Sequence, residues 1–361
     1  MKFVPHNYQR YCINRMITDP VLGLFLDMGL GKTVITLTAV NDLRFNRFAV
    51  RKVLVIAPKK VAEDTWTRES QKWDHLKMLR VIPVLGSIKQ RIRAINTPGD
   101  IWVLSRDNVS WLVDYYKNDW PFDMVIIDEL SSFKSNKAKR FRKLKSVRSH
   151  IHRIVGLTGT PTPNGLEDLW AQIYLLDEGK RLGKTLTGYR DNYFTPGARN
   201  GNVVYEYNPR TWADEEINER IKDICISMKA EDYLELPERI DNVRHIKLPD
   251  KAKKQYEELE KTMIADIDGE TIDVTSAAAL SNKLLQLCNG AVYDADGIYH
   301  EVHDEKIEAL KEIIDANAGK GILVFYNFKH DKARIQKALK KSKLRIGELK
   351  NPDSITAWNN G

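Results

Sequence analysis

Cysteine is scarce in this chain of 361 residues. Only Cys12, Cys225 and Cys288 occur, far apart and without a C-x-x-C pair. The chain therefore lacks both the dense cysteines of a disulfide framework and the paired thiols of a typical structural zinc site. Isolated thiols of this kind are typical of a reducing compartment, so we expect a cytoplasmic protein.

Long apolar runs are also missing. No run approaches the ~20 residues that cross a bilayer, and Met1–His6 has no hydrophobic core of a secretory signal. These absences, with a mean hydropathy of -0.44, argue against a membrane or secreted protein. The 42% of hydrophobic residues suffices for real cores, and the length allows two or three domains. The net charge of +8 favours a polyanionic partner.

An apolar run, Val21–Leu26, leads into a loop with the pattern of a phosphate-binding site. Glycines at 29 and 31 are followed at once by Lys32 and Thr33. Such glycines let backbone N–H groups turn around a phosphate, and the next helix adds its N-terminal partial charge. The lysine can then reach the phosphates and the threonine hydroxyl can ligate Mg²⁺. Leucine replaces the first glycine of the general signature, so a glycine turn with a solvated lysine is the alternative.

A second motif is the acidic pair Asp128 and Glu129. It follows Met124–Ile127, an apolar run of the kind that forms a buried parallel strand. Ligands of open α/β sheets collect at the C-terminal ends of such strands. One carboxylate can hold Mg²⁺ there while its neighbour orients or deprotonates a water. Alone the pair indicates a solvated turn, but with the upstream loop it predicts nucleotide hydrolysis.

Strand-like and helical segments alternate through the first half of the chain. Further apolar runs lie at 53–57, 101–105 and 154–157. This alternation predicts an α/β fold with a parallel sheet between two helical layers. In the second half we expect helices at 214–226, 250–290, 306–314 and 332–343, with a turn at 268–269 in the second of them and a last helix that begins at Ser354. We also expect a buried strand at 321–326 and a second strand at 344–349.

The segment Lys134–Arg153 contains nine Lys or Arg residues and no acidic residue. Phe141, Leu144 and Val147 recur at helical spacing, so we expect a helix with one buried stripe and a basic outer face. That face is either solvated or a phosphate-contacting surface, and the absence of acidic residues favours the second interpretation. The candidate contacts are Lys137, Lys139, Arg140, Lys143 and Lys145.

The stretch 179–208 is rich in glycine and basic residues, with aromatic residues interleaved. This composition suits stacking on bases and contact with phosphates. A structured loop explains it equally well, so the sequence leaves both interpretations open.

Four motifs, in this order and spacing, resemble those of superfamily-two helicases: MGLGKT at 28–33, IAPKKVAEDTWTRESQKW at 56–73, VIIDEL at 125–130 and GLTGTPTPNGLEDLW at 156–170. The tryptophans of the second motif, the T-G-T-P-x-x-N of the fourth and a later LLQLCN resemble the Swi/Snf-type DNA translocases. The Asp-Glu-Leu-Ser form resembles the compact bacterial and phage-borne members. The cytoplasm would then be that of a bacterium or an infected host.

The resemblance implies ATP and Mg²⁺ as cofactors. Gln9 would contact the adenine, Thr33 and Asp128 would hold Mg²⁺, and Glu129 would act on the attacking water. The catalytic residues would be these two acidic residues and Lys32. The loop residues that surround the nucleotide would be Gly29, Leu30, Gly31, Lys32 and Thr33.

The resemblance also implies double-stranded DNA as a partner, bound without sequence preference, and no membrane. Lys59, Arg106 and Asn108 fall where this family touches the DNA backbone. A further segment would couple the ATP site to the nucleic-acid groove: Thr158, Gly159 and Thr160.

The resemblance predicts a RecA-like parallel-sheet lobe with helices on both faces, a helical protrusion and the truncated start of a second RecA-like lobe. The expected domains are the first lobe, an extension with connector, the protrusion and the partial second lobe: 1–178, 179–249, 250–303 and 304–361. No residue after Trp358 supplies the family's last arginine motif, so ATP binding is a firmer expectation than hydrolysis. The alternatives to an ATP-dependent translocase on double-stranded DNA are a nucleotide- and DNA-binding fragment without turnover, and an RNA helicase.

Overall fold

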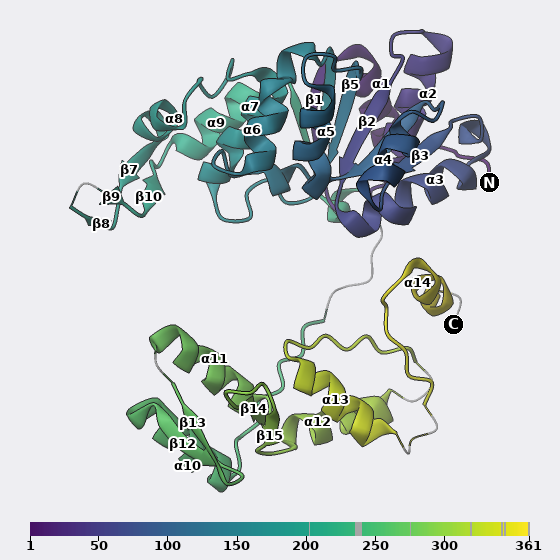
Figure 1. Ribbon diagram of the computed structural model, residues 1–361. Helices are drawn as coiled ribbons and strands as arrows, with labels where there is room; N and C mark the ends of the chain where they lie inside the picture. The colour runs from purple at the N-terminus through teal and green to yellow at the C-terminus, as the bar shows by residue number, and fades with distance from the viewer. Residues whose placement is uncertain are drawn as a thin grey trace. The chain divides into compact units, whose positions relative to one another are not determined.

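The computed structural model forms two compact units, Met1–Pro237 and Glu238–Gly361 (Figure 1). The finer domain boundaries expected from the sequence stay predictions. Among the described residues, no helix combines the length and the apolar character that crossing a membrane requires. The structure describes residues 1–201, 203–234, 240–274, 276–317, 320–340, 342 and 344–359.

A seven-stranded parallel sheet forms the centre of the first unit, in the order β11-β1-β6-β5-β2-β4-β3. The central strands are apolar because helices cover both faces, and every residue of β2 is buried. The predicted RecA-like sheet is therefore confirmed. Its strands are β1 (Val21–Leu26), β2 (Val53–Ala57), β3 (Val81–Val84), β4 (Ile101–Ser105), β5 (Met124–Asp128), β6 (Arg153–Thr158) and β11 (Cys225–Met228).

Two helical layers sandwich this sheet. Alternate strand residues point to opposite faces, so Val53 and Val55 join one core while Leu54 and Ile56 join the other. The first core contains residues of α1 (Asn7–Thr18), α2 (Lys32–Asn41) and α3 (Trp66–Lys72). The second contains residues of α4 (Ile88–Ile95), α5 (Val109–Tyr116), α6 (Lys139–Ser146), α7 (Leu169–Asp177), α8 (Leu186–Tyr193) and α9 (Ala213–Ile221).

The helix expected over 214–226 is shorter than predicted. It ends at Ile221, and Cys225–Met228 forms β11, which pairs in parallel with β1 at the sheet edge. The expectation failed because a short edge strand is stabilised by its neighbour rather than by its own pattern, and this pairing buries Ile226.

The basic segment also contains a shorter helix than expected, because α6 spans only Lys139–Ser146. Its predicted stripe is confirmed, since Phe141, Leu144 and Val147 are all buried. Arg148, however, is buried after the helix ends, and its guanidinium donates to the carbonyl oxygens of Leu175, Ile151 and Leu176. It therefore belongs to the core and not to a basic surface.

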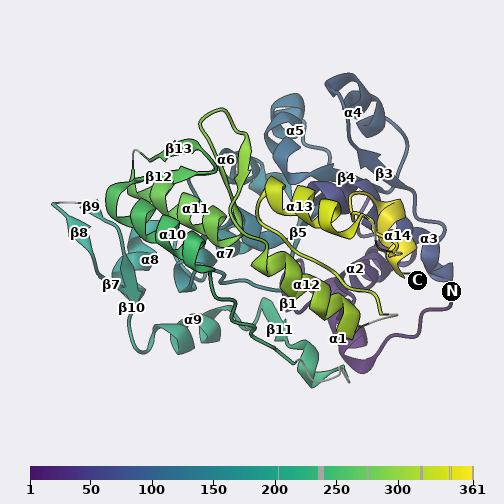
Figure 2. The ribbon, with the colours of Figure 1, turned by 90° about the horizontal axis from the view of Figure 1, so that it is seen from below.

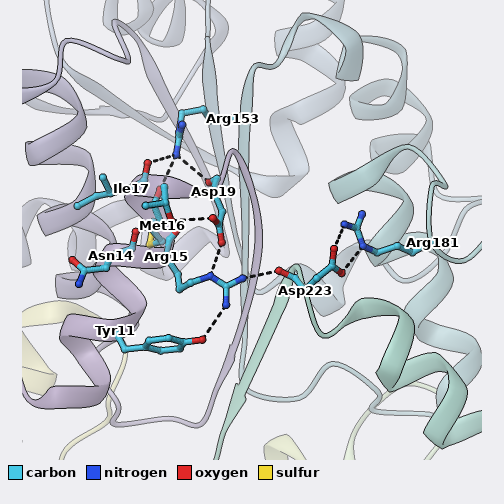
Figure 3. Close-up of polar contacts among 10 residues, drawn as sticks. Tyr11, Asn14, Arg15, Met16, Ile17, Asp19, Arg153, Arg181 and Asp223 are labelled. Carbon is cyan, nitrogen blue, oxygen red and sulfur yellow. Dashed lines mark hydrogen bonds and ion pairs between the residues drawn. The ribbon is translucent and has the colours of Figure 1, made fainter.

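A polar network anchors the C-terminal end of α1 at the N-terminal ends of the strands (Figure 3). Arg15 donates to Asp19 at 2.5 Å and to the Asp223 carbonyl at 2.6 Å, and Arg181 pairs with Asp223. Arg153 donates to three backbone carbonyls, including that of Met16. A cavity of about 450 Å³ lies here, and its three lining arginines, Arg15, Arg148 and Arg181, are held by neighbouring carboxylates and carbonyls. The network fixes α1, whose other end carries Tyr8 and Gln9.

The second unit differs from expectation in two places. First, residues 250–290 are not helical throughout, because a β-hairpin with its turn at 268–269 separates α10 (Asp250–Thr262) from α11 (Ala277–Cys288). The residues of Ile264–Ile267 are alternately exposed and buried, so one face of the hairpin is buried. The segments 321–326 and 344–349 form no strands, and Phe325 is 91% exposed. Parallel strands need paired neighbours and covered faces, which the described residues do not provide for these segments. The elements are α10 (Asp250–Thr262), β12 (Ile264–Ile267), β13 (Glu270–Asp273), α11 (Ala277–Cys288), β14 (Ala291–Tyr293), β15 (Tyr299–Glu301), α12 (Glu305–Ala316), α13 (Lys329–Leu339) and α14 (Pro352–Asn359).

Candidate active site

The loop 27–31 joins the C-terminal end of β1 to the first residue of α2. Gly29 and Gly31 have φ angles of 89° and 79°, in the left-handed region that favours glycine. A Cβ on Gly31 would lie 2.8 Å from Gln9 Nε2, so a side chain there would displace that amide. Because α2 begins at Lys32, its first backbone N–H groups have no intrahelical partner and offer an anion site.

Lys32 closes back over this loop. Its Nζ donates to the carbonyl oxygens of Leu26 at 2.6 Å and Asp27 at 3.1 Å. Burial lowers the pKa of Lys32, and the nearby charges of Asp128 and Glu129 oppose that shift. The structure therefore brings the lysine and the acidic pair, which are far apart in sequence, into one electrostatic cluster.

Gln9 and its neighbour Tyr8 hold the same loop from α1. The Tyr8 hydroxyl and Gln9 Nε2 both donate to the Leu30 carbonyl, at 3.3 and 3.4 Å. Gln9 Oε1 accepts from the His6 backbone N–H at 3.0 Å. Gln9 is thus buried against the loop rather than solvated. Tyr8 was not predicted from the sequence, where its only signal is its place beside Gln9.

Asp128 ends β5 and is held by a tryptophan from α3. Trp66 Nε1 donates to Asp128 Oδ2 at 3.0 Å, and the Trp66 side chain is fully buried. Burial raises the pKa of Asp128, while the indole hydrogen bond acts in the opposite direction. From the sequence, Trp66 was only one of the residues that carried the family resemblance. Its contact with the Asp128 carboxylate is seen only in the tertiary structure.

Glu129 has a strained backbone and a fixed side chain. Its φ of 62° is unusual for a non-glycine residue and costs roughly 1–2 kcal/mol. Glu129 Oε1 accepts from Ser131 Oγ at 2.5 Å and from Thr158 Oγ1 at 2.9 Å. Thr158 Oγ1 in turn accepts from the Thr160 N–H at 3.2 Å. A Cβ on Gly159 would lie 3.4 Å from the Leu26 carbonyl oxygen. The segment 158–160 therefore lies against both the acidic pair and the start of the phosphate loop.

The residues expected to touch DNA follow other strands of the same sheet. Lys59 comes after β2 and is 74% exposed, with Glu63 at 4.0 Å. Arg106 directly follows β4 and is half-buried. Asn108 is already engaged, because its Oδ1 accepts from Arg91 Nη1 at 2.7 Å. Since parallel strands end at one edge, Lys59 and Arg106 lie at the edge that carries the loop.

The outer face of α6 is less bare than its sequence indicated. Counter-charges come from the neighbouring segment: Lys143 pairs with Asp114, and Arg140 lies 3.7 Å from Asp107. A count of charges within 134–153 could not include these partners. No ion pair with a described residue involves three further candidate contacts, which are exposed: Lys137, just before α6, and Lys139 and Lys145 on it.

Several known proteins resemble this chain. Protein p41 of Acyrthosiphon pisum secondary endosymbiont phage 1 is 37% identical over 366 aligned positions, covering 99% of this chain and 79% of p41. The Bos taurus DNA annealing helicase and endonuclease ZRANB3 is 29% identical over 263 positions, covering 68% of this chain but 23% of ZRANB3. The Homo sapiens SWI/SNF-related matrix-associated actin-dependent regulator of chromatin subfamily A member 1 is 32% identical over 180 positions, covering 47% of this chain and 17% of its own length.

Among solved structures, the Sulfolobus solfataricus SWI2/SNF2 ATPase core in complex with dsDNA superposes with a TM-score of 0.55 at 22% identity. It covers 100% of this chain, which spans 76% of that structure, and at this identity the likeness concerns the fold. The family described as SNF2-related domain matches residues 8–291. The chain therefore belongs to the SNF2-related family and has the fold of a Swi/Snf ATPase core.

Proposed function

We propose that this chain is the motor of an ATP-dependent translocase that moves along double-stranded DNA without sequence preference. The observation that carries the proposal is the hydrogen bond from Thr158 to Glu129, beside Asp128 and Lys32 at one sheet edge. A solved relative with this fold is a complex with double-stranded DNA, which supports the choice of partner. Under this proposal the protein acts in the cytoplasm of a bacterium or an infected host cell.

The residues at the loop fit ATP with Mg²⁺. Gly29 and Gly31 adopt the left-handed φ that lets backbone N–H groups turn toward a phosphate, and a hydroxyl with a carboxylate is a donor set that suits Mg²⁺. Thr33 and Asp128 would hold the ion, which when bound neutralises charge on the phosphates. Lys32 would exchange its two carbonyl acceptors for phosphate oxygens, and the second amide hydrogen of Gln9 would donate to adenine.

Glu129 is the proposed base for the attacking water. A proton taken up by this carboxylate weakens its acceptance of the Thr158 hydroxyl, so the chemical step alters the hydrogen bonds of 158–160. This segment also contacts the loop through Gly159. We assign it the coupling between hydrolysis and the nucleic-acid groove on that basis.

The decisive experiment measures ATP hydrolysis by the chain alone, with blunt duplex DNA and with duplex RNA. A translocase motor should be stimulated by duplex DNA at least tenfold more than by RNA. Stimulation by RNA alone would favour an RNA helicase. Nucleotide and DNA binding without turnover in this chain or a longer form would favour a binding module.

Trp66→Phe should weaken the dependence of nucleotide binding on Mg²⁺. Phenylalanine fills most of the buried volume but cannot donate to Asp128, and loss of such a supporting contact lowers metal affinity about 10- to 100-fold. Titrating Mg²⁺ at a fixed concentration of a fluorescent ATP analogue measures this shift. Trp73→Phe is the matched control, because Trp73 Nε1 donates instead to Glu69, at 2.8 Å. An equal shift in both variants would assign Trp66 a purely structural role.

The salt dependence of DNA affinity tests the basic face of α6. Log affinity for duplex DNA should fall linearly with log salt, at roughly -0.9 per phosphate contact. Replacing Lys137, Lys139 and Lys145 by alanine should flatten that slope by up to ~3 units without creating sequence preference, because these cations form no ion pair with a described residue. Lys59→Ala is the comparison. If only Lys59→Ala changed the slope of log affinity against log salt, the basic residues at α6 would be solvated and would not contact DNA.

A further inference from the structure

A two-stranded ribbon extends from the first unit, away from the parallel sheet (Figures 1 and 2). At its base β7 (Phe194–Pro196) pairs with β10 (Tyr207–Pro209). Towards its tip β8 (Arg199–Asn200) pairs with β9 (Val203–Val204). Both views place the ribbon beyond α8, at the end of the unit. The proposed ATP chemistry does not use it.

The ribbon presents aromatic rings and cations to solvent. Tyr205, near the tip, is 69% exposed and makes no ring contact with a described residue. The guanidinium carbon of Arg190 lies 4.2 Å from the centre of the Tyr207 ring. An exposed tyrosine at the end of a thin ribbon adds no core packing, so its ring is available for contact with a ligand.

A pocket of about 460 Å³ lies in the same extension. Its lining includes Lys180, Tyr193, Trp212 and Arg220. The Trp212 indole is 48% exposed and meets the Tyr193 ring edge-on, with ring centres 5.9 Å apart. The Trp212 ring is therefore packed against Tyr193 on one side and remains about half exposed to solvent.

The segment 179–212, which contains the ribbon, is mainly basic, whereas the α9 residues that follow are acidic and include Glu216 of the pocket lining. Between Gly179 and Trp212 there are six Lys or Arg residues and two acidic residues. Arg181 and Arg190 are held by carboxylates from elsewhere in the unit. The other four cations form no ion pair with a described residue: Lys180, Lys184, Arg199 and Arg210.

We propose that the ribbon and its basal pocket bind a single-stranded stretch of nucleic acid that adjoins the duplex; this rests on the proposed function and extends it. Unpaired bases expose faces on which Tyr205 and Trp212 can stack, whereas the bases of a duplex are already stacked on each other. The cations would neutralise the phosphates of the strand. An acidic peptide would use the cations but would gain little from the exposed rings.

The test compares two fluorescent DNA probes in equilibrium binding to the full chain without nucleotide. One probe is a blunt duplex, and the other is the same duplex with a single-stranded arm of about ten nucleotides. Tyr205→Ala should weaken binding of the armed probe about fivefold or more and leave the blunt duplex unchanged, since each base–ring stack contributes at least that factor. Trp212→Ala should act in the same way, and Tyr205→Phe should bind as the parent does.

Phe48→Ala is the matched control, because Phe48 is 78% exposed on a loop after α2 and should affect neither probe. The Tyr205 variant decides the question even if Trp212→Ala fails to fold, since Tyr205 supports no neighbour. If Tyr205→Ala weakened binding of both probes equally, the ribbon would contact the duplex instead of the arm. If it changed binding of neither probe, the ribbon would bind no nucleic acid. Either result overturns the inference. Binding of the arm without binding of the duplex would refute the proposed function alone.

Discussion

Lys32→Ala is expected to abolish nucleotide binding while the fold remains intact. The ammonium of Lys32 is the only side-chain cation in the segment 27–33, and a phosphate that loses a buried cationic partner loses about 2–5 kcal/mol, or roughly 30- to 5,000-fold in affinity. Folding should change little, because burial already disfavours the charged lysine and its two acceptors are the backbone carbonyls of Leu26 and Asp27, where β1 ends and the loop begins. Titration with a fluorescent ATP analogue measures the loss.

Lys89→Ala is the control for this variant, because Lys89 is an exposed lysine on α4. Thermal unfolding of both variants separates lost binding from lost folding. Unchanged affinity in a folded Lys32→Ala protein would contradict the phosphate-loop assignment and leave the loop as a glycine turn.

Glu129→Gln should separate binding from hydrolysis. The amide keeps the size of the side chain and can still accept from Thr158 and Ser131, but it cannot take a proton from water. Loss of a general base lowers the rate typically 10²- to 10⁴-fold, so ATP should bind normally and remain uncleaved. The measurement is single-turnover hydrolysis with duplex DNA, in this chain or in a longer form if only that form turns over.

The matched control is Glu69→Gln, since Glu69 also accepts a hydrogen bond in the same unit, from Trp73, but lies outside the acidic pair. Turnover near the parent rate in Glu129→Gln would show that another group activates the water. A loss of nucleotide binding in that variant would instead indicate that the carboxylate supports the loop.

The sequence alone predicted the features that depend on local chemistry. Apolar runs such as 53–57 identify buried parallel strands because both of their faces must be covered. Glycines followed by Lys32 and Thr33 indicate a phosphate loop because a backbone without Cβ makes that turn without strain. Asp128 and Glu129 could be placed at a strand end for the same local reason.

Local patterns failed where a neighbour distant in sequence supplies the stabilisation. The strands expected at 321–326 and 344–349 are absent because an apolar run becomes a strand only when other strands pair with it. The opposite happened at β11, where pairing with β1 made a strand that includes Cys225 and Ile226, which were expected to be helical.

Only the tertiary structure decided which side chains support the proposed site. Trp66 and Asp128 are 62 residues apart in sequence, and Arg91 and Asn108 belong to different elements, so no spacing rule connects either pair. Tyr8 reaches Leu30 because α1 is anchored at its far end by Arg15. The residue types of a motif follow from the chemistry of the ligand that the motif is expected to bind, so a motif can be recognised in the sequence. Their supporting contacts arise from packing of the sheet and its two helical layers, which brings together residues that the chain itself keeps apart.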